Sequence, residues 1–331
     1  MYLEVITNGI IMDFDKVKKK LFGCYVTIPT PFEDKENLPV NYLALRKYAR
    51  FLIDSGLDAN YATYLAGGAA GDFSTMSLDE RLLVGETVAD EVNGKVPLAL
   101  GGQTTSTLEL VKLAKAAQSM NYDFLQISCP FYFTHTEDDF LEFVREGAKA
   151  APKVGIIVYN TFWTSTNVSH QLVSKLSEIP NIVGLKWATP RTDAMEFEDI
   201  TSSFSDRFTI IDNNLFFPYS SMPSLNARAF EVHLCNYWPE WGIKLIDEIH
   251  SKNFEEIARM MIEEAMPFYK LWVSIEKNYT SGDGYLDKLC MELIGLPSSR
   301  CRPPTRDIRK IYREDTLSMM QETGVPRLIK N

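Results

Sequence analysis

Eight short apolar segments, separated by longer amphipathic ones, constrain the fold of this chain more than any other feature. Each short segment has the length and the enrichment in β-branched or aromatic residues that are typical of a buried strand. The near-continuous apolar character of residues 155–160 (GIIVYN) indicates a parallel strand that is covered on both faces. The predicted strands are Cys24–Pro29, Ala62–Ala66, Pro97–Leu100, Phe124–Ser128, Val154–Tyr159, Ile182–Trp187, Phe208–Ile211 and Glu231–Leu234.

The segments between these strands have helical spacing. Ser77 and Glu80 form a predicted capping box at the start of one helix, and Thr136 precedes two acidic residues at the start of another. One strand and its helix together take about 26–30 residues, and eight such units make a (β/α)8 TIM barrel of the α/β class. Within residues 40–55 the helical period places five large side chains on one side: Leu43, Leu45, Tyr48, Phe51 and Leu52.

A doubly wound sheet is the rival architecture, but it places a glycine-rich phosphate turn after its first strand. Here the first strand leads into Thr30, Pro31 and Phe32 instead. We therefore expect an N-terminal extension over residues 1–20 and the barrel over residues 21–250. A C-terminal helical segment over residues 251–331 is expected to pack on the barrel. Its predicted apolar faces carry Met260, Met261, Ile262 and Phe268.

Charge and cysteine content exclude several classes of protein. Lys and Arg number 34 against 44 Asp and Glu, so the formal net charge of −10 argues against a general nucleic-acid binder. No apolar run reaches the length of about 20 residues that crosses a bilayer. Glu4 interrupts the N-terminal apolar stretch, so we expect no secretory signal and a cytoplasmic protein. The five cysteines are scattered and have no zinc spacing, so we expect reduced thiols and no metal.

Active sites of such barrels lie at the carboxyl ends of the strands, which turns the strand predictions into a set of candidate residues. Lys186 is the most informative of them, because it lies in an otherwise apolar strand. Burial lowers the pKa of an amine and leaves it nucleophilic, so a buried lysine can form a Schiff base with a ketone. A lysine at a strand end whose ammonium reaches water fits the local sequence equally well. The other candidates are Thr30, residues 67–72, Gln103, Thr104, Thr105, residues 130–132, Tyr159, Asn160, residues 212–214 and Asn236.

Four motifs, in order and in barrel context, resemble those of the dihydrodipicolinate synthase/N-acetylneuraminate lyase family of Schiff-base aldolases. Residues 26–32 (VTIPTPF) resemble the T-P-F segment of its first strand, and residues 68–72 (GAAGD) resemble its G-x-T-G-E loop. Tyr159 and Asn160 match its Y-N pair, and residues 184–188 (GLKWA) match the G-x-K strand that carries its Schiff-base lysine. The resemblance extends over roughly residues 20–305.

The resemblance implies a role for each matching residue. Lys186 condenses with the carbonyl of pyruvate or another 2-oxo acid, and Tyr159 acts as the acid and base. Tyr132 matches a family tyrosine after the fourth strand, although simple packing is an equal alternative. The substrate is held by the backbone N–H groups of Ala69 and Ala70, together with Gly68, Thr30 and Asn236. No cofactor is implied, and relatives are commonly homotetramers.

The departures from the family pattern bear on the reaction. The threonine that relays protons in the synthases is replaced by Ala69 and Ala70, and their carboxylate-binding arginine by Thr164. Residues 222–228 replace a segment that is usually glycine-rich. The chain is therefore not expected to be dihydrodipicolinate synthase itself. Asp72 and Phe73 are closer to the G-E-F form of the family's sugar-acid dehydratases.

Three functions remain after these comparisons of motifs. The first is an aldolase or lyase that joins or splits pyruvate and an aldehyde. The second is a dehydratase or deaminase that forms the same Schiff base on a hydroxylated 2-oxo acid. The third is a binding protein that has kept the barrel without turnover.

Overall fold

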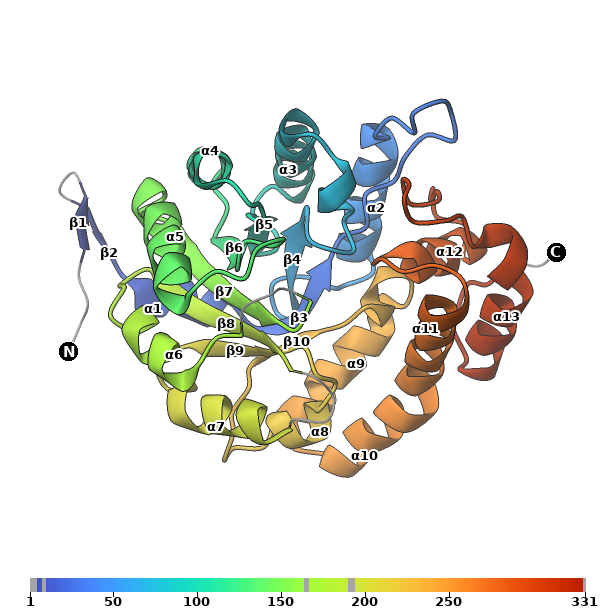
Figure 1. The fold of residues 1–331 in the computed structure, drawn as a ribbon. Helices are drawn as coiled ribbons and strands as arrows, with labels where there is room; N and C mark the ends of the chain where they lie inside the picture. The colour runs from blue at the N-terminus through green and yellow to red at the C-terminus, as the bar shows by residue number, and fades with distance from the viewer. Residues whose placement is uncertain (1–4, 8–9, 164–166, 190–193, 330–331) are drawn as a thin grey trace. The chain divides into compact units, whose positions relative to one another are not determined.

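Eight strands close into a single parallel barrel in the computed structural model, in the order β10-β3-β4-β5-β6-β7-β8-β9 (Figure 1). The (β/α)8 architecture with additional C-terminal helices is thereby confirmed. The strands are β3 (Gly23–Thr27), β4 (Ala62–Ala66), β5 (Leu98–Gly101), β6 (Phe124–Ser128), β7 (Gly155–Thr161), β8 (Ile182–Ala188), β9 (Thr209–Asp212) and β10 (Ala229–Glu231). A separate hairpin pairs β1 (Val5–Thr7) with β2 (Ile10–Met12).

The structure describes residues 5–7, 10–163, 167–189 and 194–329. The chain divides into two compact units. The first comprises residues 1–25, 62–65 and 97–231, and the second comprises residues 26–61, 66–96 and 232–331. Every barrel strand has residues in the first unit. The domain bounds expected from the sequence stay a prediction.

An apolar layer fills the amino-terminal end of the barrel in the first unit. Each of the eight strands contributes one buried side chain to it, and helix α1 (Phe14–Lys20) adds Phe14 and the following Leu21. The eight strand residues are Tyr25, Leu65, Ala99, Phe124, Ile157, Val183, Ile211 and Ala229. Because Phe14 belongs to this layer and Val17 packs against it, the α1 part of the predicted N-terminal extension is part of the core.

Apart from α1, the helices of the first unit lie outside its strands (Figure 1). They are α4 (Thr107–Ser119), α5 (Glu137–Ala150), α6 (His170–Leu176), α7 (Ala194–Phe204) and α8 (Phe217–Ser220). The predicted cap at Thr136 is confirmed, and Asp139 completes it as a capping box.

The second unit is mainly helical. Its capping box at Ser77 and Glu80 is confirmed. The helices are α2 (Tyr42–Asp54), η1 (Phe73–Thr75), α3 (Leu78–Val92), η2 (Leu234–Asn236), α9 (Pro239–His250), α10 (Phe254–Arg259), η3 (Met260–Ala265), α11 (Met266–Asn278), α12 (Tyr285–Leu293) and α13 (Arg309–Glu322).

Three local predictions are wrong. The last strand ends at Glu231 rather than beginning there, because the chain leaves the sheet and turns into η2. Leu43 is 65% exposed, since Ala44, Leu45, Tyr48 and Leu52 already fill the buried face of α2. Ile262 is 68% exposed.

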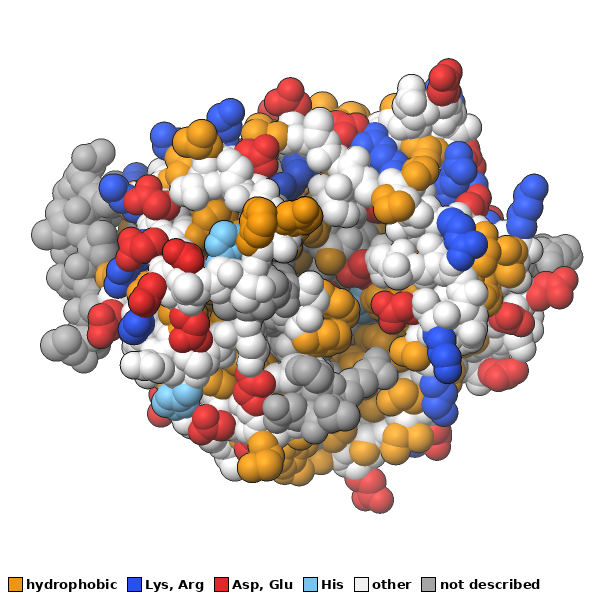
Figure 2. All heavy atoms as spheres, viewed as in Figure 1, with side chains coloured by type: hydrophobic (Ala, Val, Ile, Leu, Met, Phe, Trp, Pro, Cys, Tyr) orange, Lys and Arg blue, Asp and Glu red, His pale blue; other side chains and the backbone are white. Residues whose placement is uncertain are grey.

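Figure 2 shows acidic and basic side chains interspersed over the face that it draws. In the part of the chain that the structure describes, no helix has both the length and the apolar character needed to span a membrane.

Candidate active site

Lys186 lies inside the barrel, near the carboxyl end of β8. Its Nζ is 2.6 Å from Oε2 of Glu231 on β10, and both side chains are only 6% exposed. The two residues come from strands that β9 separates, so their contact crosses the interior of the barrel. The buried amine therefore has a buried carboxylate as its partner, which the sequence analysis did not predict. The role of Lys186 as the Schiff-base residue stays a prediction.

Two aromatic rings complete the surroundings of the amine. Nζ of Lys186 lies 4.6 Å from the ring centroid of Tyr159 and 5.2 Å from that of Tyr25. At these distances the negative face of each ring attracts a cation. The amine is thus held by one carboxylate and two rings, and the alternative of a snorkelling lysine does not describe it.

Tyr159 is buried next to Lys186, on the adjacent strand and in direct register with it. The side-chain amide of Asn213 donates a hydrogen bond of 3.1 Å to the Tyr159 hydroxyl oxygen. This hydrogen bond fixes the position of the Tyr159 hydroxyl, and the Tyr159 ring lies against the amine of Lys186.

A polar layer lies directly above the apolar one, as the two-residue period of strands dictates. Gln126 follows Phe124 by two positions, and Glu231 follows Ala229 in the same way. The Tyr25 hydroxyl donates to Oε1 of Gln126 at 3.0 Å, across the barrel. Burial, followed by the nearby Glu231 carboxylate, raises the pKa of Tyr25, so this hydroxyl stays protonated. The layer thus combines one cation, one anion and neutral hydrogen-bonding groups.

β8 departs from this period, and the departure brings the lysine inward. Val183 belongs to the apolar layer although it lies three positions before Lys186. The register between β7 and β8 shifts at this point, because Ile156 pairs with Ile182 whereas Ile157 pairs with Gly184. An extra residue of this kind lets two side chains of opposite parity face the same side of a sheet.

The loop after β4, in the second unit, carries the predicted carboxylate-binding groups. The backbone N–H groups at the end of this turn form hydrogen bonds within the turn. Gly71 N donates to Gly68 O, and Asp72 N donates to Ala69 O. Among the residues that the structure describes, none accepts a hydrogen bond from the backbone N–H of Ala69 or Ala70. Two adjacent amides of this kind are typical of a small anion-binding concavity.

Thr30 and a C-terminal helix hold this loop within the second unit. The Thr30 hydroxyl donates to the carbonyl oxygen of Gly71 at 2.7 Å. Nζ of Lys288, on α12, is 2.6 Å from Oδ2 of Asp72, and both side chains are buried. A side chain at Gly284 would collide with the carbonyl of Ala70, so only glycine permits this approach of α12.

Asn236 belongs to a buried polar cluster of the second unit. Its amide donates to Asp287 at 2.7 Å, and its oxygen accepts from the Tyr48 hydroxyl. Nδ1 of His233 lies 3.0 Å from the same Asp287 carboxylate. Both polar atoms of the Asn236 side chain thus have partners within the protein, and a role in substrate binding stays a prediction.

Tyr132 lies on the loop after β6 and is 86% exposed. Its backbone φ is +90°, and its ring meets the edge of Phe133 at 4.8 Å between centroids. The ring is therefore not a core residue, and its catalytic role stays a prediction. Thr164, which stands where the synthases have an arginine, lies outside the described residues.

Sequence reasoning missed Glu231 as a site residue. An isolated glutamate in the apolar segment AFEV carries the same signal as the lysine in GLKWA. A buried charge requires a partner, so each of these two residues predicts the other. The wrong bounds predicted for the last strand hid this pairing, because they placed Glu231 at the start of the strand rather than at its end.

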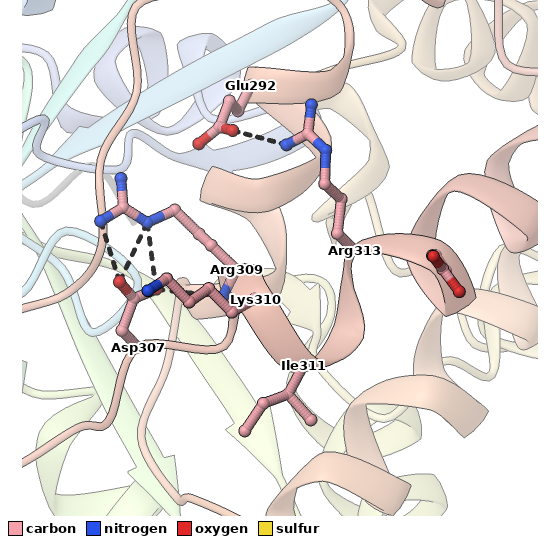
Figure 3. A pocket seen from close by; sticks show the side chains of 7 residues that line it. Glu292, Asp307, Arg309, Lys310, Ile311 and Arg313 are labelled. Atoms are coloured by element: carbon pink, nitrogen blue, oxygen red, sulfur yellow. Dashed lines mark hydrogen bonds and ion pairs between the residues drawn. The ribbon is translucent and has the colours of Figure 1, made fainter. Parts of the chain in front are cut away.

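A cleft lies between the end of α12 and α13, away from the residues predicted for the site (Figure 3). Its arginines are neutralised within the protein, since Arg309 pairs with Asp307 and Asp34, and Arg313 pairs with Glu292. Such a cleft offers no net charge to a ligand. In the described ranges, no group of three or more His, Cys, Asp or Glu side chains is placed to hold a metal ion.

The chain is also similar to known proteins along most of its length. The chain matches the Dihydrodipicolinate synthetase family over residues 20–323. It is 28% identical to the 4-hydroxy-tetrahydrodipicolinate synthase of Syntrophus aciditrophicus over 92% of this chain and 98% of that protein. It is 25% identical to the Acetivibrio thermocellus protein of the same name, over 93% of this chain and all of that one.

Solved structures show the same fold at lower identity. Dihydrodipicolinate synthase from Acinetobacter baumannii, solved with pyruvate, superposes with a TM-score of 0.79 at 22% identity. N-acetylneuraminate lyase from Proteus mirabilis superposes with a TM-score of 0.78 at 20% identity. Each alignment covers 92% of this chain and 99% of the other.

The fold and the family match together define a barrel enzyme of the lyase and synthase type. The chain belongs to the dihydrodipicolinate synthetase family.

Proposed function

We propose that this protein is a class I aldolase or lyase that makes or breaks a C–C bond between pyruvate and an aldehyde through an imine at Lys186. The observation that carries the proposal is the burial of the Lys186 amine beside Tyr159 in the polar layer of the barrel. A lysine that only served solubility or packing has no reason to occupy this position, since burying its charge is costly.

Each predicted residue has a part in the proposed reaction. Lys186 forms the imine, and Tyr159 transfers protons, assisted by the hydrogen bond from Asn213. The amides of Ala69 and Ala70 bind the carboxylate of the 2-oxo acid, in a loop that begins at Gly68. Thr30 and Asn236 complete the substrate site, and Tyr132 is the third proposed catalytic residue.

Pyruvate is the proposed first substrate, in keeping with the pyruvate named for the Acinetobacter baumannii relative. The imine withdraws electrons from the neighbouring carbon, which is the work that a metal performs in other aldolases. No cofactor is therefore required by the proposed chemistry. The second substrate is an aldehyde.

A dehydratase that acts on a hydroxylated 2-oxo (sugar) acid is the second candidate. Asp72 and Phe73, after Gly71, favour it through their likeness to the G-E-F form of the dehydratases. It uses the same imine but expels water or ammonia. A binding protein without turnover is the third candidate.

Borohydride trapping tests the imine directly. Incubation with pyruvate and then borohydride should add the mass of one reduced adduct, and peptide mapping should place it on Lys186. Lys288 is the matched internal comparison, because it is an equally buried lysine paired with a carboxylate. An adduct on Lys288, or a Lys186→Ala variant that still traps pyruvate, contradicts the assignment.

Product analysis separates the three candidates. An aldolase exchanges the methyl protons of pyruvate for deuterium and consumes an aldehyde, whereas a dehydratase releases a deoxygenated 2-oxo acid from a hydroxylated one. A binding protein turns over neither class of substrate, and the absence of an adduct with every 2-oxo acid tried favours it.

Aspartate semialdehyde should be a poor substrate, because Ala69 and Ala70 lack the relay hydroxyl and Thr164 replaces the arginine. The lost charged hydrogen bond alone costs about 1.5–3 kcal/mol, or roughly one to two decades in kcat/KM. A kcat/KM near 10⁵ M⁻¹s⁻¹, about the value of an ordinary efficient enzyme, is the result that overturns this view.

We further propose a cytoplasmic homotetramer. Sedimentation velocity at micromolar concentration should show a species of four chains. A lone 37.7 kDa species contradicts it.

A further inference from the structure

Glu231 is the group that contacts the amine of Lys186 most directly. The distance of 2.6 Å between its Oε2 and Nζ is that of a short, charge-assisted hydrogen bond. A carboxylate at this distance can accept a proton along the existing bond without any movement of the backbone.

Stability does not explain why a charged pair occupies this position. The desolvation of two buried ions usually cancels their attraction, and apolar residues of similar volume are often as stable or more so. The layer just beneath is filled by apolar side chains such as Ile157, Val183 and Ala229, so the barrel accommodates them readily. The position of this pair therefore calls for an explanation other than stability.

The chemistry of imine formation needs the group that Glu231 provides. The lysine of an ion pair is an ammonium, which has no lone pair with which to attack a carbonyl. One proton must leave nitrogen before attack, and one must reach the hydroxyl of the carbinolamine before water departs. We propose that Glu231 is a further catalytic residue, which takes the first proton from Lys186 and later returns a proton to that hydroxyl. This inference rests on the proposed function.

The proposed step balances in atoms and charge. The carboxylate accepts a proton from the ammonium and becomes a carboxylic acid, and the neutral amine adds to the C2 carbonyl of the 2-oxo acid. A second proton moves from nitrogen to the former carbonyl oxygen. The acid then protonates this hydroxyl, the C–O bond breaks and water leaves. The products are one iminium, one carboxylate and one water.

The charge state of the barrel is the same before and after this step. The iminium takes the place of the ammonium beside the same carboxylate. The rings of Tyr25 and Tyr159 contact the nitrogen and can stabilise either cation. The buried layer therefore needs no new counter-ion. The carbinolamine hydroxyl is one carbon away from Nζ, which keeps it near the acid that must protonate it.

The rate of adduct formation tests this role. Wild-type protein, Glu231→Gln and Glu231→Asp are mixed with pyruvate, quenched with borohydride at increasing times and measured by intact mass. Loss of a general acid–base group should slow trapping about 10²–10⁴-fold in Glu231→Gln, and less in Glu231→Asp, which keeps a carboxyl. Formate should partly restore the rate of Glu231→Ala. Glu91→Gln removes a carboxylate paired with Arg50 on the helices of the second unit and should trap at the wild-type rate.

The pH dependence of the trapping rate provides a second readout. Glu231, Lys186, Tyr25 and Tyr159 are the titratable groups brought together here, and only the first is altered. The rate of Glu231→Gln should lose the dependence that the carboxyl contributes, which a purely structural residue does not alter.

Three outcomes overturn the inference. Glu231→Gln that traps as fast as wild type, or faster, shows that the carboxylate only holds the ammonium. If this variant does not fold, a Glu231→Ala variant that traps at the wild-type rate without added formate is equally decisive. A wild-type protein that traps no 2-oxo acid removes the proposed function and this role together, whereas normal wild-type trapping with an unaffected variant removes this role alone.

Discussion

Replacement of Lys288 by Met should destabilise the protein strongly, although it preserves the length and apolar stem of the side chain. In the second unit, the Lys288 ammonium is 2.6 Å from the Asp72 carboxylate, and the two side chains are 1% and 5% exposed. Its Nζ also lies 4.4 Å from the ring centroid of Phe32. The substitution removes both interactions and leaves the carboxylate in place.

The structure sets the size of the effect. Burial raises the pKa of Asp72, and the Lys288 ammonium offsets part of that rise. Without the ammonium, the carboxylate is a buried charge without its main counter-ion, and removal of one partner of such a pair costs about 3–5 kcal/mol. At roughly 2 °C per kcal/mol for a chain of this size, Tm should fall by about 6–10 °C.

A double-mutant cycle measures the pair itself. Lys288→Met, Asp72→Asn and the double variant are compared by guanidinium denaturation, followed by both circular dichroism and tryptophan fluorescence. Asn suits position 72, because φ there is +59°. The double variant should be less destabilised than the sum of the single ones, since it buries no unpaired charge. A Lys288→Met variant within about 1 kcal/mol of wild type, or simple additivity, refutes the reasoning.

Three further predictions concern the barrel. Tyr159→Phe should lower kcat about 10²–10⁴-fold in steady-state assays with Tm nearly unchanged. A near-wild-type kcat shows that Tyr159 serves packing and is not catalytic. Gly184→Ala should cost about 1–3 kcal/mol in denaturation experiments, because an added Cβ lies 2.5 Å from Cδ2 of Leu21; an unchanged midpoint contradicts this packing. Burial raises the pKa of Asp212 to about 6, so the folded state binds its proton more tightly than the unfolded state. Its contribution to stability should therefore fall by about 1 kcal/mol between pH 5 and pH 7, and a wild-type minus Asp212→Asn difference that is flat or rising over this range is the refuting result.

Burial pattern alone predicts most of the fold. The runs Ala62–Ala66 and Phe124–Ser128 match observed strands at both ends, because turn residues or polar residues bound each run. The prediction of the last strand was wrong because no turn residue or polar residue directly follows its end. Residues 229–235 stay buried after the chain leaves the sheet, so apolar character continues where strand pairing does not.

The candidate site is less predictable, because it depends on which residues of different strands meet. Lys186 and Tyr159 follow from motifs, and their register on adjacent strands confirms that they are neighbours. Asn213 lies in a set of polar residues after β9, and its sequence does not indicate which of them contacts the tyrosine. Tyr25 looks like any aromatic core residue until its hydroxyl is seen to bond Gln126.

The register shift in β8 explains why local periodicity is insufficient here. With strict alternation, Val183 and Lys186 face opposite sides of the sheet, and one of them has to leave the barrel interior. The chain keeps both inside by inserting one residue, so that the apolar layer stays closed and the amine still reaches Glu231. Such an insertion weakens the local ladder of hydrogen bonds, and bulges of this kind occur where a side chain must be re-aimed. The local irregularity, the buried charge and its buried partner thus share one explanation, which is the delivery of a lysine amine to the interior of the barrel.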